Sequence, residues 1–72
     1  MTAASLAQKY GETLTVTDLM EIMKLGRRTV DRMLHSGELP AVKIGNQYRV
    51  GVDSFAKWWV QQEKANRISI LH

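Results

Sequence analysis

Glycine and proline interrupt the middle of this 72-residue chain at Gly26, Gly37, Pro40 and Gly45. Because each of these residues weakens or ends a helix or strand, the elements between them must be short. The chain contains no Cys, so neither disulfide bonds nor a thiolate metal site can hold such elements together. Stability must come from one small apolar core, which leaves little room for an enclosed catalytic pocket. These features favour a single binding domain over an enzyme.

A first helix is predicted from Asp18 to Lys24. Its apolar residues cover one broad helical face: Leu19, Met20, Ile22 and Met23. Thr17 is the expected N-cap, because a threonine hydroxyl accepts a backbone N–H of the first helical turn. A short extended segment is expected at residues 14–16, and residues 1–13 are expected to form a leader with at most one or two loosely packed helical turns.

A second helix is predicted to begin near Arg27, after the break at Gly26. Its apolar residues Val30, Met33 and Leu34 follow the i, i+3, i+4 spacing of a helix packed on one side. Gly37 suits the left-handed residue that follows a helix. Two short helices separated by a tight turn form a helix-turn-helix.

A β-hairpin is predicted after Pro40, with strands over residues 41–44 and 47–50 joined by Gly45–Asn46. One face of the hairpin is expected to pack on the helices through Val42, Ile44, Tyr48 and Val50. The opposite face would then present Lys43, Gln47 and Arg49.

A third helix is predicted from Asp53 or Ser54 to about Ala65, ending at Asn66. Trp58 and Trp59 are adjacent in it and point about 100° apart. One of them is therefore expected in the core and the other at a surface, which would suit a partner.

Positive charge is concentrated in the middle of the chain. Residues 24–49 contain six Lys and Arg against two Asp and Glu, a local net charge of +4, whereas the whole chain carries +3. Such a cluster is typical of a surface that binds nucleic acid, although an ordinary solvated helix face would explain the arginines alone.

Residues 14–60 resemble the excisionase-type helix-turn-helix family, small winged-helix domains related to the DNA-binding part of MerR-type regulators. The resemblance is carried by residues 14–23, 27–34 and 36–50, and residues 36–50 are the most specific, because a helix end, Leu39–Pro40 and an arginine-bearing hairpin follow one another at the spacing of the family. Two positions differ: Lys24 stands where the family usually has Gly, and Gly26 where it has a Ser or Thr cap. The resemblance implies a mainly α fold with a small β-hairpin, a winged helix-turn-helix.

The resemblance also implies that the second helix enters the major groove of DNA and that the hairpin, as a wing, lies along the minor groove. The residues expected to contact DNA are Arg27, Arg28, Thr29, Asp31, Arg32, His35, Lys43, Asn46, Gln47 and Arg49. Arg28 and Arg32 share a helical face, where their guanidinium groups could bind guanine or phosphate. Asp31 either accepts a hydrogen bond from cytosine or, as we favour, orients Arg27 or Arg28. His35 either interacts with the last carbonyls of its helix or contacts DNA.

The function implied by the resemblance is that of an excisionase, a recombination directionality factor of a phage or mobile element. Its expected partners are double-stranded DNA, an integrase and further copies of the chain on DNA. A small MerR-like transcription regulator is the alternative, and a protein-interaction domain without a DNA role is a third possibility. The DNA-binding domain is expected to span residues 14–66, with an apolar tail at residues 67–72 that either binds a partner or packs on the third helix.

Several classes of function are disfavoured by the sequence. The chain has no nucleophile–base pair, phosphate loop or matched carboxylates, so we expect no enzyme activity, cofactor or metal. No apolar run approaches the roughly 20 residues that span a membrane, and residues 1–7 do not have the character of a secretory signal. We therefore expect a cytoplasmic protein associated with the nucleoid.

Overall fold

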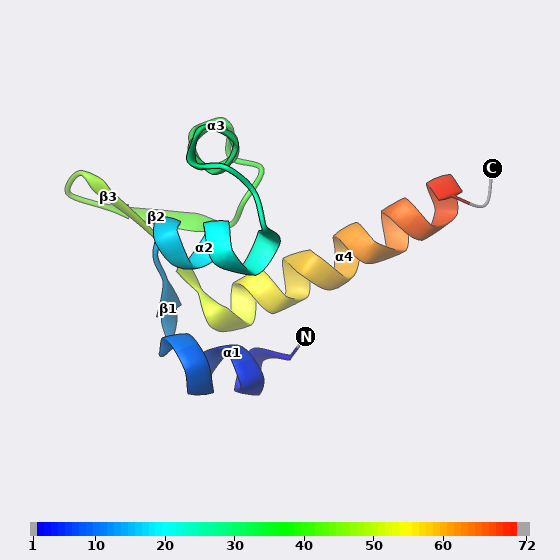
Figure 1. Ribbon diagram of the computed structural model, residues 1–72, viewed down its shortest axis with the longest axis horizontal. Coiled ribbons are helices and arrows are strands. Elements are labelled where there is room, and N and C mark those ends of the chain that lie inside the picture. Colours follow the sequence, from blue (N-terminus) through cyan, green and yellow to red (C-terminus); the bar gives the residue numbers. More distant parts are fainter. Residues whose placement is uncertain (1, 71–72) are drawn as a thin grey trace.

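A computed structural model describes the backbone of residues 2–70 and the side chains of residues 2–65. Within this part of the chain, four helices surround a small antiparallel sheet (Figure 1). The elements in chain order are α1 (Ala3–Tyr10), β1 (Thr13–Leu14), α2 (Val16–Met23), α3 (Arg27–Ser36), β2 (Ala41–Ile44), β3 (Gln47–Gly51) and α4 (Val52–Ile70). This arrangement confirms the predicted fold class, a mainly α winged helix-turn-helix.

The sheet has the strand order β1-β3-β2. The long strand β3 pairs with β2 through the predicted Gly45–Asn46 loop, and its end pairs with β1, where Leu14 lies opposite Val50. The two-residue strand β1 thus fastens the base of the hairpin to the segment that leads into α2.

One apolar core joins every helix to the sheet. Its buried members are Leu6, Leu14, Leu19, Val30, Leu34, Leu39, Val50, Val52 and Phe55. Because α2 and α3 contribute Leu19, Val30 and Leu34, the core fixes the helix-turn-helix against the hairpin and α4.

Helix α2 and its N-cap both begin two residues earlier than predicted. Thr15, and not Thr17, is the N-cap: its hydroxyl accepts from the Asp18 backbone N–H at 3.2 Å, and its own N–H donates to the Asp18 carboxylate at 3.0 Å. This reciprocal capping box requires an acceptor side chain three residues after the cap. Thr17 has Met20 at that position, so the prediction of Thr17 as the cap was wrong for a reason visible in the sequence.

The turn between α2 and α3 is made by a residue in a left-handed conformation. Lys24 has φ 55° and ψ 45° where the family usually has Gly, and the next residue, Leu25, donates its N–H to the Met20 carbonyl at 3.2 Å. Lys24 therefore preserves the tight turn at a conformational cost. Helix α3 then begins after Gly26, which is an N-cap without a side-chain bond, and ends at Gly37 with φ 83°, both as predicted.

The leader segment forms a well-packed helix. Leu6 of α1 is only 6% exposed and belongs to the core, and α1 packs against α4. Lys9 Nζ also lies 3.4 Å from Glu21 Oε1 on α2, an exposed pair that adds little stability. The expectation of loose packing was wrong, because Leu6 is buried and Ala3, Ala7 and Tyr10 also pack against the core.

The hairpin faces are assigned differently from the prediction. The register pairs Val42 with Arg49 and Ile44 with Gln47, and directly paired residues point to the same face of a sheet. Val42 and Ile44 are therefore on the outer face, 61% and 63% exposed. Of the four residues predicted to face the helices, only Tyr48 and Val50 do so. Lys43 pairs with Tyr48 and lies on that face, so the prediction that Lys43 shares the outer face with Gln47 and Arg49 was wrong.

Helix α4 is longer than predicted. It starts at Val52, which is buried and donates its N–H to the Glu12 carbonyl at 3.0 Å, and its backbone stays helical to Ile70. Asn66 therefore does not end the helix, consistent with the small penalty for Asn inside a helix. The last turns project away from the body of the molecule (Figure 1), while the side chains of the predicted tail, residues 67–72, lie outside the described residues.

Trp58 and Trp59 are both half-buried and both pack against the core, so neither is the fully buried residue that the sequence suggested.

In the part of the chain that the structure describes, no helix has the length and apolar character to cross a membrane.

Candidate nucleic-acid interface

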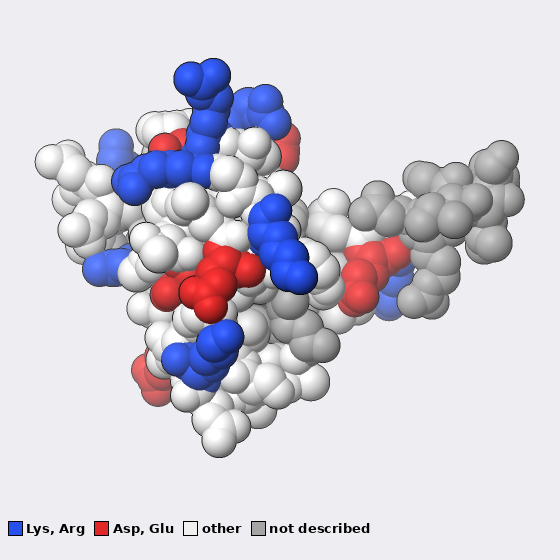
Figure 2. All heavy atoms as spheres, viewed as in Figure 1, with Lys and Arg blue, Asp and Glu red and all other residues white. Residues whose placement is uncertain are grey.

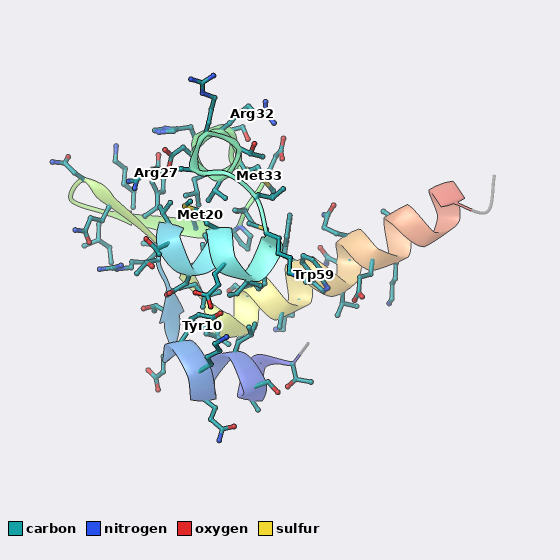
Figure 3. All side chains as sticks on the ribbon, viewed as in Figure 1. Tyr10, Met20, Arg27, Arg32, Met33 and Trp59 are labelled. Atoms are coloured by element: carbon teal, nitrogen blue, oxygen red, sulfur yellow. The ribbon has the colours of Figure 1, made fainter. Side chains whose placement is uncertain are left out.

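The outer side of α3 presents two arginines away from the core. Val30 is completely buried, and Arg28 and Arg32 each lie two residues from it, about 200° around the helix axis. Both arginines are exposed, and Figure 3 shows Arg32 on the side of α3 that faces away from α2. Among the side chains of residues 2–65, neither forms an ion pair, so both guanidinium groups are available to a ligand.

Arg28 and Arg32 form the outer row of α3. Beside the outer row, α3 borders a hollow of about 430 Å³ that lies between α3, the start of α2 and the hairpin. Seven of the ten predicted DNA-contacting residues line it: Arg27, Asp31, His35, Lys43, Asn46, Gln47 and Arg49. The α3 residues of this set follow one another at intervals of four and form the neighbouring stripe of the helix. Arg28 and Arg32 do not line the hollow, so the predicted site consists of an outer row and an adjoining concave surface, and the half-buried Thr29 belongs to neither.

Sequence reasoning missed four residues of the hollow: Thr15, Val16, Thr17 and Tyr48. The first three form the beginning of α2, where backbone N–H groups and the positive end of the helix dipole are exposed. The signal that could have revealed them is the capping box of Thr15 and Asp18, which marks where that helix end lies.

Asp31 contacts Arg27, one of the two arginines that it was expected to orient. The distance from Arg27 Nε to Asp31 Oδ2 is 3.7 Å; the Arg27 side chain is largely exposed and that of Asp31 is half-buried. Such a pair contributes little to stability, but it holds together two residues that line the hollow and involves neither Arg28 nor Arg32.

His35 lies in the last turn of α3 and reaches the hairpin. The Tyr48 hydroxyl and His35 Nδ1 are 3.2 Å apart, and the two rings meet edge to face with centroids 5.3 Å apart. Lys43 Nζ lies 5.8 Å from the centroid of the Tyr48 ring. Tyr48 thus connects α3 to the wing and sets their relative position.

The wing cations are also held in place. Arg49 is half-buried, and its Nη2 donates to Gln47 Oε1 at 2.9 Å. Gly45, with φ 62°, turns the chain at the tip and leaves Asn46 exposed. The hollow therefore contains three cations, Arg27, Lys43 and Arg49, against one carboxylate.

On the face of the molecule seen in Figure 2, positive and negative side chains lie over different elements. Figure 2 shows Lys and Arg projecting from α3 and the hairpin, whereas acidic side chains gather over α2, which carries Asp18 and Glu21. Among the described residues, no three His, Asp or Glu side chains converge as they would around a metal ion. This surface can bind a polyanion through several separate cations.

The fold and this surface define a winged helix-turn-helix domain with cations on α3 and on the hairpin wing. A family model described as a helix-turn-helix domain matches residues 13–63. The chain belongs to this excisionase-type helix-turn-helix family of DNA-binding proteins.

Two relatives are similar to the central part of the chain. They are “Putative DNA-binding protein MT0521” and “Putative DNA-binding protein Rv0500A”, from two strains of Mycobacterium tuberculosis, each 44% identical over 43 residues. The match covers 60% of this chain and 55% of each relative, so the chain spans about half the length of the relatives that it matches. No solved structure matches the chain.

Proposed function

We propose that the chain is a sequence-specific DNA-binding protein that acts as an excisionase of a phage or mobile element. Helix α3 would enter the major groove, and the hairpin wing would lie along the adjacent minor groove. The observation that carries the proposal is the position of Arg28 and Arg32, opposite the buried Val30 and beside the cationic hollow. A helix with this geometry can place its outer row in the major groove of DNA without disturbing the core.

The residues of the site divide naturally between base and backbone contacts. Arg28 and Arg32 are exposed on the side of α3 opposite the buried Val30 and suit guanine O6 and N7. Arg27, Lys43 and Arg49 surround the hollow beside the start of α2, which suits a phosphate group of the DNA backbone. Asn46 at the exposed wing tip would meet sugar or minor-groove acceptors.

The domain would act by binding and positioning DNA rather than by catalysis. A module of this size typically buries about 600–1,000 Å² of its surface on DNA, so one copy gives modest sequence specificity. Higher specificity would come from several copies on adjacent sites or from an integrase bound beside it. The protein would then be found with the nucleoid.

A small MerR-like transcription regulator is the second candidate, because the same contacts would serve at a promoter and the fold does not fix the biological role. Footprinting of the purified protein across the DNA that flanks its own gene distinguishes the two. Protection of repeated sites beside a recombination site supports the excisionase, and protection within a promoter supports the regulator. Absence of any sequence-specific footprint at low salt would contradict both.

The role of residues 67–72 can be tested on the same DNA. Their deletion should leave binding to a single site unchanged and weaken cooperative binding or excision if the segment contacts an integrase or a neighbouring copy. Unchanged excision would exclude that role.

A further inference from the structure

A second concave surface lies on the other side of α3 from the cationic hollow. It is a groove of about 280 Å³ between the end of α2, α3 and α4, and it shares no lining residue with the hollow. Figure 3 shows Met33 and Trp59 on the opposite side of α3 from Arg27. Its apolar lining residues are Met23, Leu25, Met33, Trp58 and Trp59. A ligand in this groove would therefore leave the proposed DNA-binding surface uncovered.

The aromatic side of the groove is held by the core. The ring of the fully buried Phe55 lies 5.7 Å from that of Trp58 and 6.0 Å from that of Trp59, centroid to centroid, while both tryptophans remain partly exposed. Fixed aromatic rings are favoured anchors in protein interfaces, since they offer apolar area at a small cost in conformational entropy. Met23 and Met33 opposite them can adapt to the shape of a ligand.

The charge of the groove is opposite to that of the rest of the domain. Glu38 and Glu63 line it and no Lys or Arg does, although the chain carries a net charge of +3. Among the side chains of residues 2–65, neither carboxylate takes part in an ion pair. Leu25, which is 38% exposed, adds apolar surface beside them. A duplex DNA ligand would be repelled here, whereas a cationic segment with apolar side chains would be complementary.

We propose that this groove binds an amphipathic, lysine- or arginine-bearing segment of a partner protein. The apolar side chains of the segment would pack between Trp58 and Met33, and its cations would lie beside Glu38 and Glu63. Because the groove and the cationic hollow lie on opposite sides of α3, the domain can hold the partner and DNA at the same time. The site is independent of the proposed contacts with DNA and gives the domain a second binding function.

The probe is a synthetic amphipathic peptide with leucine on one helical face and lysine on the other, and the matched control peptide carries glutamate in place of lysine. The chain has two tryptophans, and both line the groove, so intrinsic fluorescence of the full chain reports occupancy directly. We expect the lysine peptide to bind at least about ten-fold more tightly than the glutamate peptide, by electrostatic complementarity. Fluorescence that responds to neither peptide, or equally to both, would overturn the proposal.

Charge reversal separates the groove from general charge effects. In the double variant Glu38→Lys and Glu63→Lys, the preference should change to the glutamate peptide. The control variant Glu12→Lys and Glu21→Lys has the same net charge, and its substitutions lie outside the groove, so it should keep the original preference. The same loss of preference in both variants would reject the groove as the binding site.

Sedimentation of the full chain alone identifies a competing occupant. If the chain self-associates and only the Glu38→Lys and Glu63→Lys variant becomes monomeric, the groove binds a second copy and the proposal of a separate partner is wrong. A chain that stays monomeric while it binds the lysine peptide supports it. DNA affinity measured in parallel distinguishes failure of the groove from failure of the proposed function.

Discussion

At the scale of single residues, the arginines of α3 have distinct positions that sequence spacing only partly revealed. Arg27 is engaged with Asp31 at 3.7 Å beside the hollow, whereas Arg28 and Arg32 point outward from the side opposite Val30. An arginine without an intramolecular partner can meet a base edge with both arms of its guanidinium group. The outer row should therefore contribute more to sequence discrimination than Arg27.

Under the proposed function, substitution of Arg28 or Arg32 by Ala should weaken binding to the specific DNA site by about 1–3 kcal/mol, because each removes one proposed guanidinium contact in the major groove of DNA. Gel-shift titration at fixed salt measures this loss. Lys57→Ala is the matched control, since Lys57 is an exposed cation on α4 outside the hollow. If all three variants bind alike, α3 is not the recognition helix.

Lys24 gives a prediction about stability. Its φ of 55° is unfavourable for a residue with a side chain, by about 1–2 kcal/mol, and glycine avoids that cost. Because glycine also makes the unfolded chain more flexible, Lys24→Gly should raise the free energy of unfolding by about 0.5–1 kcal/mol, as measured by urea denaturation. Lys24→Ala removes the same charge but keeps the strain and should stay close to the parent; a stabilisation of equal size in both variants would assign the effect to charge.

At the scale of elements, the sequence predicted helix-turn-helix, hairpin and third helix, and these are present, because glycine, proline and apolar spacing are local signals. The faces of the hairpin were not obtained from alternation alone. Val42 and Ile44 alternate with polar residues as a buried face would, yet the two-residue loop pairs Ile44 with Gln47 and so turns both aliphatic side chains outward. Register, and not apolar character, decides which face is buried.

The packing of α1 and the contact between α3 and the wing show a second limit of prediction from sequence. Burial of Leu6 depends on α4, and the bond between Tyr48 and His35 joins residues thirteen positions apart. Such contacts depend on how elements assemble, and no local pattern in the sequence reports them. The members of the candidate site were therefore predictable as residue types, but their division into an outer row and a hollow was not.

The register makes a direct prediction with two chemically identical substitutions. Val50→Ala should lower the free energy of unfolding by about 2 kcal/mol, because Val50 is completely buried and the lost methyl groups leave a cavity. Val42→Ala should change it by less than about 0.5 kcal/mol, because Val42 is 61% exposed on the outer face. Urea denaturation of both variants gives the comparison, and equal losses would mean that the register is different.

At the scale of the whole molecule, charge is segregated around α3. Cations occupy its outer row, the hollow and the wing, whereas the groove on its other side carries Glu38 and Glu63. This polarity would orient the domain before contact, because a negatively charged duplex attracts one side and is repelled by the other. A partner segment at the groove would then lie on the side away from DNA.

The salt dependence of DNA binding tests this orientation as a whole. If the three cations of the hollow (Arg27, Lys43 and Arg49) meet phosphates while Arg28 and Arg32 meet bases, the slope of log K against log salt should be about −3. Affinity would then fall about 50-fold when salt rises from roughly 50 to 200 mM.

The same titration separates base from phosphate contacts for each arginine. Substitution of a phosphate contact by Ala should reduce the slope by about one, whereas substitution of a base contact should lower affinity and leave the slope nearly unchanged. We expect Arg49→Ala to change the slope and Arg32→Ala to relax sequence preference, because Arg49 lines the hollow and Arg32 lies on the outer row. Binding that does not respond to salt would mean that these cations do not meet DNA, and α3 would then have to be assigned to another ligand.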